Sequence, residues 1–261
     1  MKSNSAIVLA AGSGRRLGKA GNGDPKCLQK IQDKHLIEWQ IEILNSCGIT
    51  DVTVATGYKN EMLNRFGSRQ IQNIQFETTN MVYTLHNALK ELNSGPILVT
   101  YGDILVSPKS IQLLLDSDSD ISILSDENFL EYWSERSSNP ISDLETFVLE
   151  KDFVIEIGGT PETIAEVQGQ YMGISYFSKA GFQTVKNLLH AASCGTSLNE
   201  KPLESAFMTD LFQELIMRGN QITSISNRQF WIEIDTAEDL KNELIEKRIN
   251  QIHSDLEGMG R

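Results

Sequence analysis

Long apolar runs and cysteines are both scarce in this chain. No apolar stretch approaches the roughly 20 residues that a membrane-spanning helix needs. The apolar segment near the N-terminus is too short for a signal peptide before it meets Gly12 and Arg15. Three cysteines, Cys27, Cys47 and Cys194, share no metal-like spacing. We therefore expect a cytoplasmic protein with reduced thiols and no membrane partner.

Basic residues are also few. The chain has 23 Lys and Arg against 35 Asp and Glu, a net charge of −12, which argues against nucleic acid as a main partner. Six of the basic residues, with only one acid, fall within residues 1–30. A basic segment in an acidic protein is typical of a local site for a polyanion, with a solvated charged loop as the alternative.

The chain does have a regular alternation of strand and helix patterns. Four apolar runs are typical of buried strands, at residues 7–10, 52–55, 97–101 and 121–124. Helical patterns separate them, at residues 35–47, 59–66, 81–92 and 107–115. This order predicts an α/β fold, a Rossmann-like, doubly wound and mostly parallel sheet. With 40% apolar residues and no repeat or linker, residues 1–261 are expected to form one domain.

The pattern changes after residue 126. Residues 126–145 are polar with interspersed aromatic residues, as in a loop or short helix inserted over a site. Added antiparallel strands are expected at 147–149, 154–157 and 171–177. We take about 126–175 as a small inserted region. The last patterns predict helices at 179–192 and 204–218, strands at 221–226 and 230–234, and a closing helix at about 236–255.

A basic, glycine-rich loop follows the first strand. Residues 9–17 read LAAGSGRRL, and Asp24-Pro25-Lys26 comes a short loop later. Glycines let backbone N–H groups approach an anion closely, and Arg and Lys side chains neutralise it. The spacing is neither that of the G-x-x-x-x-G-K-[ST] phosphate loop nor that of the G-x-G-x-x-G dinucleotide turn. Because α/β proteins hold nucleotides at such a turn, we expect a nucleotide site of another type.

Carboxylates follow the ends of two apolar runs. Asp103 comes after 97–101, and Asp235 comes after 230–234, with Glu233 two residues before it. Ligands gather outside the carboxyl ends of strands in such sheets, and Mg²⁺ is commonly held by one or two carboxylates plus substrate phosphates. Alone, each aspartate is equally consistent with a turn or a helix cap. Together with the basic loop, Asp103, Glu233 and Asp235 predict a site for one or two Mg²⁺ ions.

These motifs resemble a known family. The similar segments are LAAG-x-G-x-RL at 9–17, PK-x-L at 25–28, LIE-x-Q at 36–40, GYK at 57–59, GD at 102–103 and WIEIDT-x-EDL at 231–240. In this order, over nearly the whole chain, they resemble the nucleotidyltransferases with a glycosyltransferase-A-like fold. These include sugar-1-phosphate nucleotidylyltransferases and the cytidylyltransferases for phosphocholine and 2-aminoethylphosphonate. The resemblance implies that fold and transfer of a nucleotide.

One segment points to the cytidylyltransferase branch. The stretch TNMVYTL at 79–85 resembles the Asn-Asn-x-Tyr-Ser-Leu segment of the phosphocholine and aminoethylphosphonate enzymes, with Met81 where the second Asn is common. The resemblance therefore implies CTP as donor, with Asn80 and the backbone from Leu9 to Gly12 around the base and ribose. The nucleotide-binding residues that we expect are Leu9, Ala10, Ala11, Gly12, Ser13, Gly14, Arg15, Arg16, Lys26, Thr79, Asn80, Thr84 and Gly102.

Charge decides the expected mechanism. A phosphate or phosphonate monoester is largely dianionic at neutral pH, so it can attack the α-phosphorus of a nucleotide without a general base. Catalysis should then be positioning plus electrostatics. We expect Mg²⁺ to bridge the donor and acceptor phosphates. We expect Lys26 and Arg16 to be catalytic, with Lys26 neutralising the α-phosphate in the transition state and Arg16 holding the β- and γ-phosphates.

The acceptor is expected under the inserted region. A choline head group would need an aromatic box, for which Tyr132, Trp133 and Tyr171 are available. A primary ammonium would need carboxylates, and Asp143, Glu145 and Asp210 are candidates. Both acceptors stay open, as does a packing role for the aromatic residues. The acceptor-binding residues that we expect are Trp133, Arg136, Glu145, Gln170, Tyr171 and Asp210.

Two other functions stay open from the sequence. One is a sugar-1-phosphate nucleotidylyltransferase that uses UTP, GTP or dTTP. The other is a nucleotide-sensing domain without catalysis, against which the presence of Lys26, Asp103 and Asp235 argues. The sequence also leaves open which small molecule accepts the nucleotide and whether the chain forms a homodimer.

Overall fold

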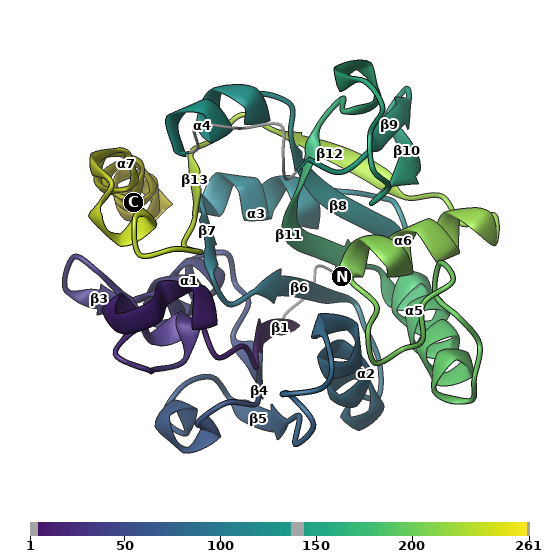
Figure 1. The fold of residues 1–261 in the computed structure, drawn as a ribbon, viewed down its shortest axis with the longest axis horizontal. Helices are drawn as coiled ribbons and strands as arrows, with labels where there is room; N and C mark the ends of the chain where they lie inside the picture. The colour runs from purple at the N-terminus through teal and green to yellow at the C-terminus, as the bar shows by residue number, and fades with distance from the viewer. Residues whose placement is uncertain (1–4, 137–143, 260–261) are drawn as a thin grey trace.

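The computed structural model describes residues 5–136 and 144–259, and it is built around a nine-stranded sheet (Figure 1). The strand order is β5-β4-β1-β6-β11-β8-β12-β10-β9. The strands are β1 (Ser5–Ala10), β4 (Asp51–Thr56), β5 (Arg69–Gln72), β6 (Ile97–Tyr101), β8 (Ile121–Asp126), β9 (Phe147–Glu150), β10 (Phe153–Ile157), β11 (Gln170–Phe177) and β12 (Thr223–Asn227).

The two halves of the sheet differ in strand direction. β1 pairs in parallel with both β4 and β6, and β5 continues this parallel half. Beyond β6, β11 is antiparallel to β6 and β8, β12 is parallel to β8, and β10 and β9 are antiparallel additions. The α/β architecture is as predicted. One difference concerns β11, which lies at the centre of the sheet although its first residues belong to the expected insertion.

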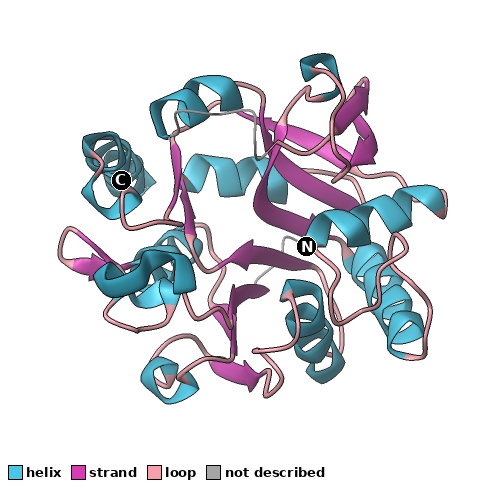
Figure 2. Cartoon of the chain, viewed as in Figure 1, coloured by secondary structure: helices cyan, strands magenta, loops and turns pink. Residues whose placement is uncertain are grey.

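Helices cover both faces of the sheet (Figure 2). They are α1 (Leu36–Ser46), α2 (Met81–Glu91), α3 (Pro108–Leu115), α4 (Phe129–Arg136), α5 (Lys179–Ser193), α6 (Met208–Met217) and α7 (Glu243–Met259). Most buried apolar residues form one core under α1, α3 and α7 or another under α2, α5 and α6, and a smaller cluster includes Phe129 of α4. The apolar stripes of these helices therefore explain the doubly wound arrangement. Within the described ranges, no helix combines the length and apolarity that crossing a membrane requires.

A second, two-stranded sheet brings the end of the chain back to its first half. β7 (Ile104–Val106) pairs antiparallel with β13 (Trp231–Glu233). The backbone N–H of Ile234 also donates to the carbonyl of Asp103 at 3.0 Å. This pairing brings Asp103, which follows β6, close to Asp235, which follows β13, so their two carboxylates can act at one site. A further short hairpin joins β2 (Lys30–Ile31) and β3 (Lys34–His35).

Several element boundaries differ from the expected ones for local reasons. The closing helix begins at Glu243 instead of 236, because the Asp239 carboxylate accepts hydrogen bonds from Thr236 and completes a separate 3₁₀ turn. The expected helix at 59–66 is only a 3₁₀ turn, because Lys59 has a left-handed backbone with φ of 45°. α6 begins at Met208, four residues later than expected, where Asp210 caps it. The sequence did not reveal β5 or β7, which are very short.

Candidate active site

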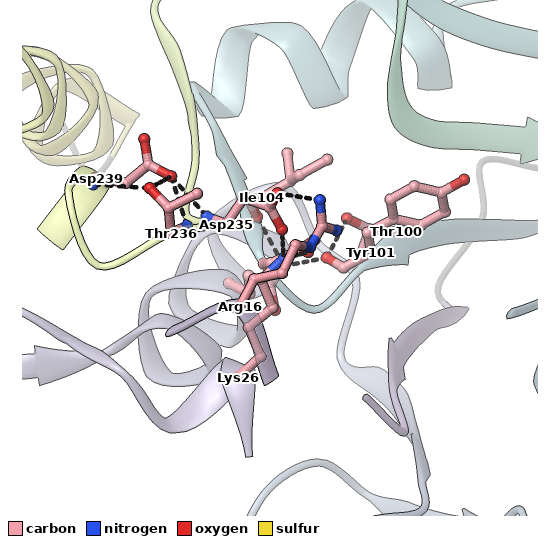
Figure 3. Close-up of polar contacts among 10 residues, drawn as sticks. Arg16, Lys26, Thr100, Tyr101, Ile104, Asp235, Thr236 and Asp239 are labelled. Carbon is pink, nitrogen blue, oxygen red and sulfur yellow. Dashed lines mark hydrogen bonds and ion pairs between the residues drawn. The ribbon is translucent and has the colours of Figure 1, made fainter. Parts of the chain in front are cut away.

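Lys26 lies between the two aspartates that follow β6 and β13. Its Nζ is 2.5 Å from Asp103 Oδ2 and 2.5 Å from Asp235 Oδ1 (Figure 3). All three side chains are mostly buried, with exposed fractions of 14%, 18% and 15%. Three segments that are far apart in the sequence therefore meet at one charged centre. The sequence placed these residues in one site, but it did not indicate that the lysine would bridge both carboxylates.

The backbone around this centre is fixed by buried hydrogen bonds. Gln40 on α1 donates through Nε2 to the carbonyls of Tyr101, at 2.6 Å, and Ile104, at 2.7 Å. It therefore clamps the turn that presents Asp103. Gly102 in this turn packs against β1, where a Cβ atom would lie 2.9 Å from the Leu9 carbonyl oxygen. The sequence offered Gln40 only as part of the LIE-x-Q motif and did not indicate this contact.

The electrostatics of this centre suit a divalent cation. Burial alone would lower the pKa of Lys26, but the two aspartates outweigh burial and raise this pKa. Asp103 Oδ1 is buried without a hydrogen-bond partner in the described part of the chain, so this carboxylate has a coordination position to offer. Among those residues, no cluster of three or more His, Cys, Asp or Glu forms a complete cage. Two carboxylates fit Mg²⁺, which keeps water and substrate phosphates as its other ligands.

The two arginines of the basic loop lie at different places in the structure. Arg16 lies in a 3₁₀ segment (Arg15–Gly21) and forms an ion pair with Asp235, while its own side chain is 74% exposed (Figure 3). Ser13, Gly14 and Arg15 line a separate cavity of about 210 Å³ beside the loop. Tyr58 stabilises the loop, because its hydroxyl donates a hydrogen bond to the Gly23 carbonyl at 3.0 Å. Arg16 therefore joins the charged centre, and Arg15 does not.

A cavity of about 180 Å³ collects most of the residues expected to bind the nucleotide. It lies at the carboxyl ends of β1 and β6, the position where ligands gather in open α/β sheets. The expected residues in its lining are Leu9, Ala10, Ala11, Gly12, Lys26, Thr79, Asn80, Thr84 and Gly102. The lining also includes Asp103, so the charged centre forms one part of this wall. We call this space the nucleotide cavity.

Hydrogen bonds order the loop that forms one side of the nucleotide cavity. Buried Asn73 donates through Nδ2 to Thr79 Oγ1 and Thr84 Oγ1, both at 2.9 Å. Asn80 caps α2 by accepting from the Met81 N–H at 3.0 Å. Phe76, which the sequence reasoning missed, lies on the same loop and lines the cavity. An aromatic residue in a polar segment is too weak a signal to identify it.

A larger cavity of about 530 Å³ lies beyond Met81 and Tyr101, which line both cavities. Arg16, Glu233 and Asp235 border it on the β13 side. The expected acceptor residues in its lining are Trp133, Glu145, Gln170 and Tyr171. Phe207 and Thr209, which the sequence did not single out, also line it. We call this space the acceptor cavity.

One expected acceptor residue, Asp210, lies outside this lining, and the side chain of another, Arg136, lies outside the described residues. Asp210 is buried, caps α6 through the Phe207 N–H at 2.8 Å, and accepts from Lys201 Nζ at 2.9 Å and from Asn199. These bonds give it a structural position behind the cavity wall. Arg136 ends α4, and its side chain, like all of Asp143, lies outside the described residues. The acceptor role of Arg136 stays a prediction.

The aromatic residues considered for a choline box are mostly packed away. Tyr132 is buried against Trp231, with ring centroids 4.8 Å apart, and its hydroxyl accepts from the Glu233 N–H. The Tyr171 ring packs edge-on against Tyr101 and Phe212. Trp133 lines the cavity and donates through Nε1 to Gln170 Oε1. The structure thus gives most of these rings the packing role that the sequence left open.

Comparison with known proteins agrees with this geometry. A family model described as a MobA-like NTP transferase domain matches residues 6–193. The chain is 30% identical over 246 residues to the CTP:phosphoglutamine cytidylyltransferase of Campylobacter jejuni, which covers 90% of this chain and 97% of that protein. It is 24% identical over 193 residues to the 2-aminoethylphosphonate cytidylyltransferase of Lancefieldella rimae, over 72% of each chain. The predicted resemblance to cytidylyltransferases is therefore confirmed.

A solved structure supports the fold. The inositol-1-phosphate CTP transferase from T. maritima superposes with a TM-score of 0.76 at 16% identity, over 97% of each chain. This likeness confirms the predicted glycosyltransferase-A-like nucleotidyltransferase fold. The family model spans the loop, the nucleotide cavity and Asp103. The chain belongs to the family of MobA-like NTP transferase domains and is a nucleotidyltransferase.

Proposed function

We propose that this protein is a Mg²⁺-dependent cytidylyltransferase that transfers CMP from CTP to a small phosphorylated or phosphonylated acceptor and releases pyrophosphate. The observation that carries the proposal is the position of Lys26, 2.5 Å from both Asp103 and Asp235. Lys26 and Asp103 line the nucleotide cavity, and Asp235 lines the acceptor cavity. Phosphates that enter from either side would therefore meet the same charged centre.

The reaction needs charge control more than proton transfer. The acceptor oxygen forms a bond to the α-phosphorus of CTP, the bond from that phosphorus to the bridging oxygen breaks, and the electron pair leaves with pyrophosphate. Since the acceptor is already largely dianionic, with a second pKa of about 6, no general base is required. The barrier lies in bringing two polyanions together, which positioning and fixed positive charge reduce.

Lys26 and Arg16 supply that positive charge in our proposal. The Lys26 ammonium, now shared by two carboxylates, would donate instead to an α-phosphate oxygen as negative charge develops there. The exposed Arg16 guanidinium would leave Asp235 and bind the β- and γ-phosphates. Mg²⁺ held by Asp103 and Asp235, with Glu233 beside them, would offset the charge of the donor and acceptor phosphates.

The preference for CTP is supported by the relatives and by the polar groups of the nucleotide cavity. Both relatives described above are named as cytidylyltransferases. Thr79, Asn80 and Thr84 give this cavity hydroxyl and amide groups that can bind a base, and the backbone from Leu9 to Gly12 gives it a surface for the ribose. We therefore propose that cytosine binds at the loop held by Asn73.

A donor panel tests the proposal. The protein is incubated with Mg²⁺ and each of CTP, UTP, GTP and dTTP, alone and with 2-aminoethylphosphonate, phosphocholine or glucose-1-phosphate, and pyrophosphate release is measured. We expect release with CTP and a phosphonate or phosphocholine. Release with UTP, GTP or dTTP and the sugar phosphate would instead identify a sugar-1-phosphate nucleotidylyltransferase. Nucleotide binding without release under any condition would identify a sensing domain and contradict the proposal.

A further inference from the structure

A buried asparagine supports the wall of the nucleotide cavity from behind. Asn73 directly follows β5, is 1% exposed and is not one of the described residues that line the cavity. Its backbone N–H donates to the carbonyl of Thr56, the last residue of β4, at 2.7 Å. From Asn73 the chain runs through residues 74–80 to α2, which lies beside β5 (Figure 1). The sheet therefore fixes the position of Asn73 relative to this loop.

The orientation of the Asn73 amide follows from its hydrogen-bond partners. The Gln75 backbone nitrogen lies 2.9 Å from Asn73 Oδ1. A backbone N–H can only donate, so the amide oxygen must face Gln75. The amide nitrogen then donates to Thr79 Oγ1 and to Thr84 Oγ1, both at 2.9 Å. Each of these hydroxyl oxygens is an acceptor toward Asn73, which leaves its own proton for another partner.

The two hydroxyl groups differ in where that proton goes. Thr79 donates its proton to the Gln75 carbonyl at 2.8 Å, and a carbonyl can only accept. Thr79 can therefore still offer a ligand a lone pair. The Thr84 hydroxyl, on a residue that is 3% exposed, has Asn73 as its only hydrogen-bond partner within residues 5–136 and 144–259, so its proton remains available. Since both residues line the nucleotide cavity, the cavity wall presents an acceptor and a donor.

This pattern matches the polar edge of cytosine and not that of uracil. Cytosine carries an amino group, N4, beside the ring acceptor N3, whereas uracil carries the acceptor O4 beside a protonated N3. With uracil, the lone pairs of O4 would face the lone pair of Thr79. Thr84 could accept from the uracil N3–H only if its own proton stayed unpaired in a buried position. A site that matches hydrogen-bonding groups rejects such a mismatch strongly, because buried polar groups are left without partners.

We propose that Asn73 is a positioning residue that gives the nucleotide cavity its preference for cytosine over uracil. It fixes Thr79 as the acceptor for the N4 amino group and Thr84 as the donor to N3. This inference rests on the proposed function and gives a physical reason for its choice of CTP. Asn73 acts through the two threonines, because it lies behind the cavity wall.

Four nucleotides that differ at single groups of the base test this inference. They are CTP, UTP, 3-deazacytidine triphosphate, in which a C–H replaces N3, and the triphosphate of 2-pyrimidinone riboside, which lacks the amino group. Their dissociation constants are measured by calorimetric titration of the protein with Mg²⁺ and without an acceptor. We expect CTP to bind about fivefold or more tightly than either single-group analogue, and about 30-fold or more tightly than UTP, which leaves both positions mismatched. Equal binding of CTP and UTP would overturn the inference.

Asn73→Asp replaces the amide nitrogen with an oxygen and so reverses this hydrogen bonding. The carboxylate can still accept from the Gln75 N–H, but it also accepts the proton of Thr84, which is then withdrawn from the cavity. We expect the preference for CTP over UTP to fall by about tenfold or more, whereas loss of a merely structural contact would weaken the binding of both nucleotides alike. An unchanged preference in N73D would overturn the inference. Asn93→Asp, at an exposed position after α2 and outside both cavity linings, is the matched control and should keep the preference.

Thr84→Val gives a second test that does not depend on the folding of N73D. It keeps the shape of the side chain and removes the donor. CTP should therefore lose its advantage over the 3-deaza analogue and keep its advantage over the 2-pyrimidinone nucleotide. An advantage over the 3-deaza analogue that survives this substitution would overturn the inference.

The binding measurements also separate this inference from the proposed function, because they require no turnover. Preferential binding of CTP that is lost in N73D, with no pyrophosphate release with any acceptor, would uphold this inference and contradict the proposed function. Pyrophosphate release with CTP and an acceptor, together with equal binding of CTP and UTP, would uphold the proposed transfer reaction and overturn this inference.

Discussion

The nucleotide cavity and the acceptor cavity, which share Met81 and Tyr101, differ in the residues that line them. The nucleotide cavity is lined by residues 9–103, and the part of its wall at the ends of two parallel strands includes glycines and alanines. Apart from Arg16, Met81 and Tyr101, the acceptor cavity is lined by residues 133–239, many of them large. Where glycine, alanine and backbone form a cavity wall, a substitution can only add atoms to the space that the ligand needs. Where large side chains form the wall, a substitution can alter which ligand binds.

This contrast predicts that a substitution at the charged centre slows the reaction with every acceptor, whereas a substitution in the lining of the acceptor cavity affects only some acceptors. The largest test is Lys26→Met, which removes the ammonium and keeps the apolar stem. We expect kcat to fall by about 10²- to 10³-fold with every acceptor, the usual cost of removing one group that stabilises transition-state charge. Pyrophosphate release measures it, and circular dichroism checks the fold.

The matched control for that variant is Lys30→Met, an exposed lysine in β2 that lies outside both cavities. It should retain nearly all activity. Near-normal turnover of K26M with any acceptor would contradict the assignment of Lys26, and a loss confined to one acceptor would move Lys26 from the shared centre to the acceptor side.

The same variant should have the opposite effect on metal binding. In the resting protein, the Lys26 ammonium occupies both carboxylates that we expect to hold Mg²⁺. Removing it should therefore increase the affinity of the nucleotide-free protein for Mn²⁺, used as a probe, by roughly tenfold, or about 1.4 kcal/mol. Titration followed by electron paramagnetic resonance measures this affinity without turnover. Unchanged or weaker Mn²⁺ binding in K26M would place the metal elsewhere.

The sequence predicted the residues of the charged centre better than the lining of the acceptor cavity. The reason is the topology of the sheet. Asp103 and the loop after β1 follow adjacent parallel strands, so their proximity follows from strand order alone. Asp235 could be added because its motif resembled that of known enzymes. In the structure, β13 lies within the predicted strand at 230–234, but its partner β7 has only three residues, and the sequence did not reveal the pairing that delivers Asp235.

Which residues line the acceptor cavity depends on tertiary packing, and no local sequence pattern predicts that packing. Glu145 and Asp210 looked equivalent in the sequence, yet Asp210 is consumed by capping α6 and by Lys201, while Glu145 faces the cavity. Tyr132 and Trp133 are adjacent, but the first is buried beneath Trp231 and only the second reaches the cavity. Which of two similar residues is free to bind a ligand is decided by tertiary contacts of distant segments.

Phe76 offers a smaller test of the nucleotide side, because it is one of two aromatic residues, with Tyr101, among the described residues that line this cavity. It is half-buried, and its ring centroid lies 6.0 Å from that of Tyr58. If it covers the base, Phe76→Ala should raise the KM for CTP by about 5- to 150-fold, since stacking on a base contributes about 1–3 kcal/mol. The change should be the same for every acceptor. Steady-state kinetics at saturating acceptor measure it.

Ile74→Ala is the matched control for that variant, because Ile74 lies on the same loop and is 80% exposed. It should leave the KM for CTP unchanged. Equal effects of the two substitutions would indicate a general disturbance of the loop. A Phe76→Ala effect that varies with the acceptor would break the separation between the two cavities.

The smallest expected effect concerns the stability cost of Glu145 on the acceptor side. Burial and Asp210 raise the pKa of Glu145, so between the unfolded and folded pKa values the folded protein binds more protons than the unfolded chain. The free energy of unfolding of the wild type therefore falls as pH rises through this range. Glu145→Gln is neutral throughout, so it should match the wild type near pH 4 and exceed it at pH 7.5, by no more than about 0.5 kcal/mol because the side chain is exposed. Urea unfolding at both pH values measures the difference, with Glu150→Gln, which removes a carboxylate from an exposed position on β9, as the control. A ligand-binding carboxylate should be costly in this way when its ligand is absent, and a less stable E145Q at pH 7.5 would show instead that Glu145 supports the fold.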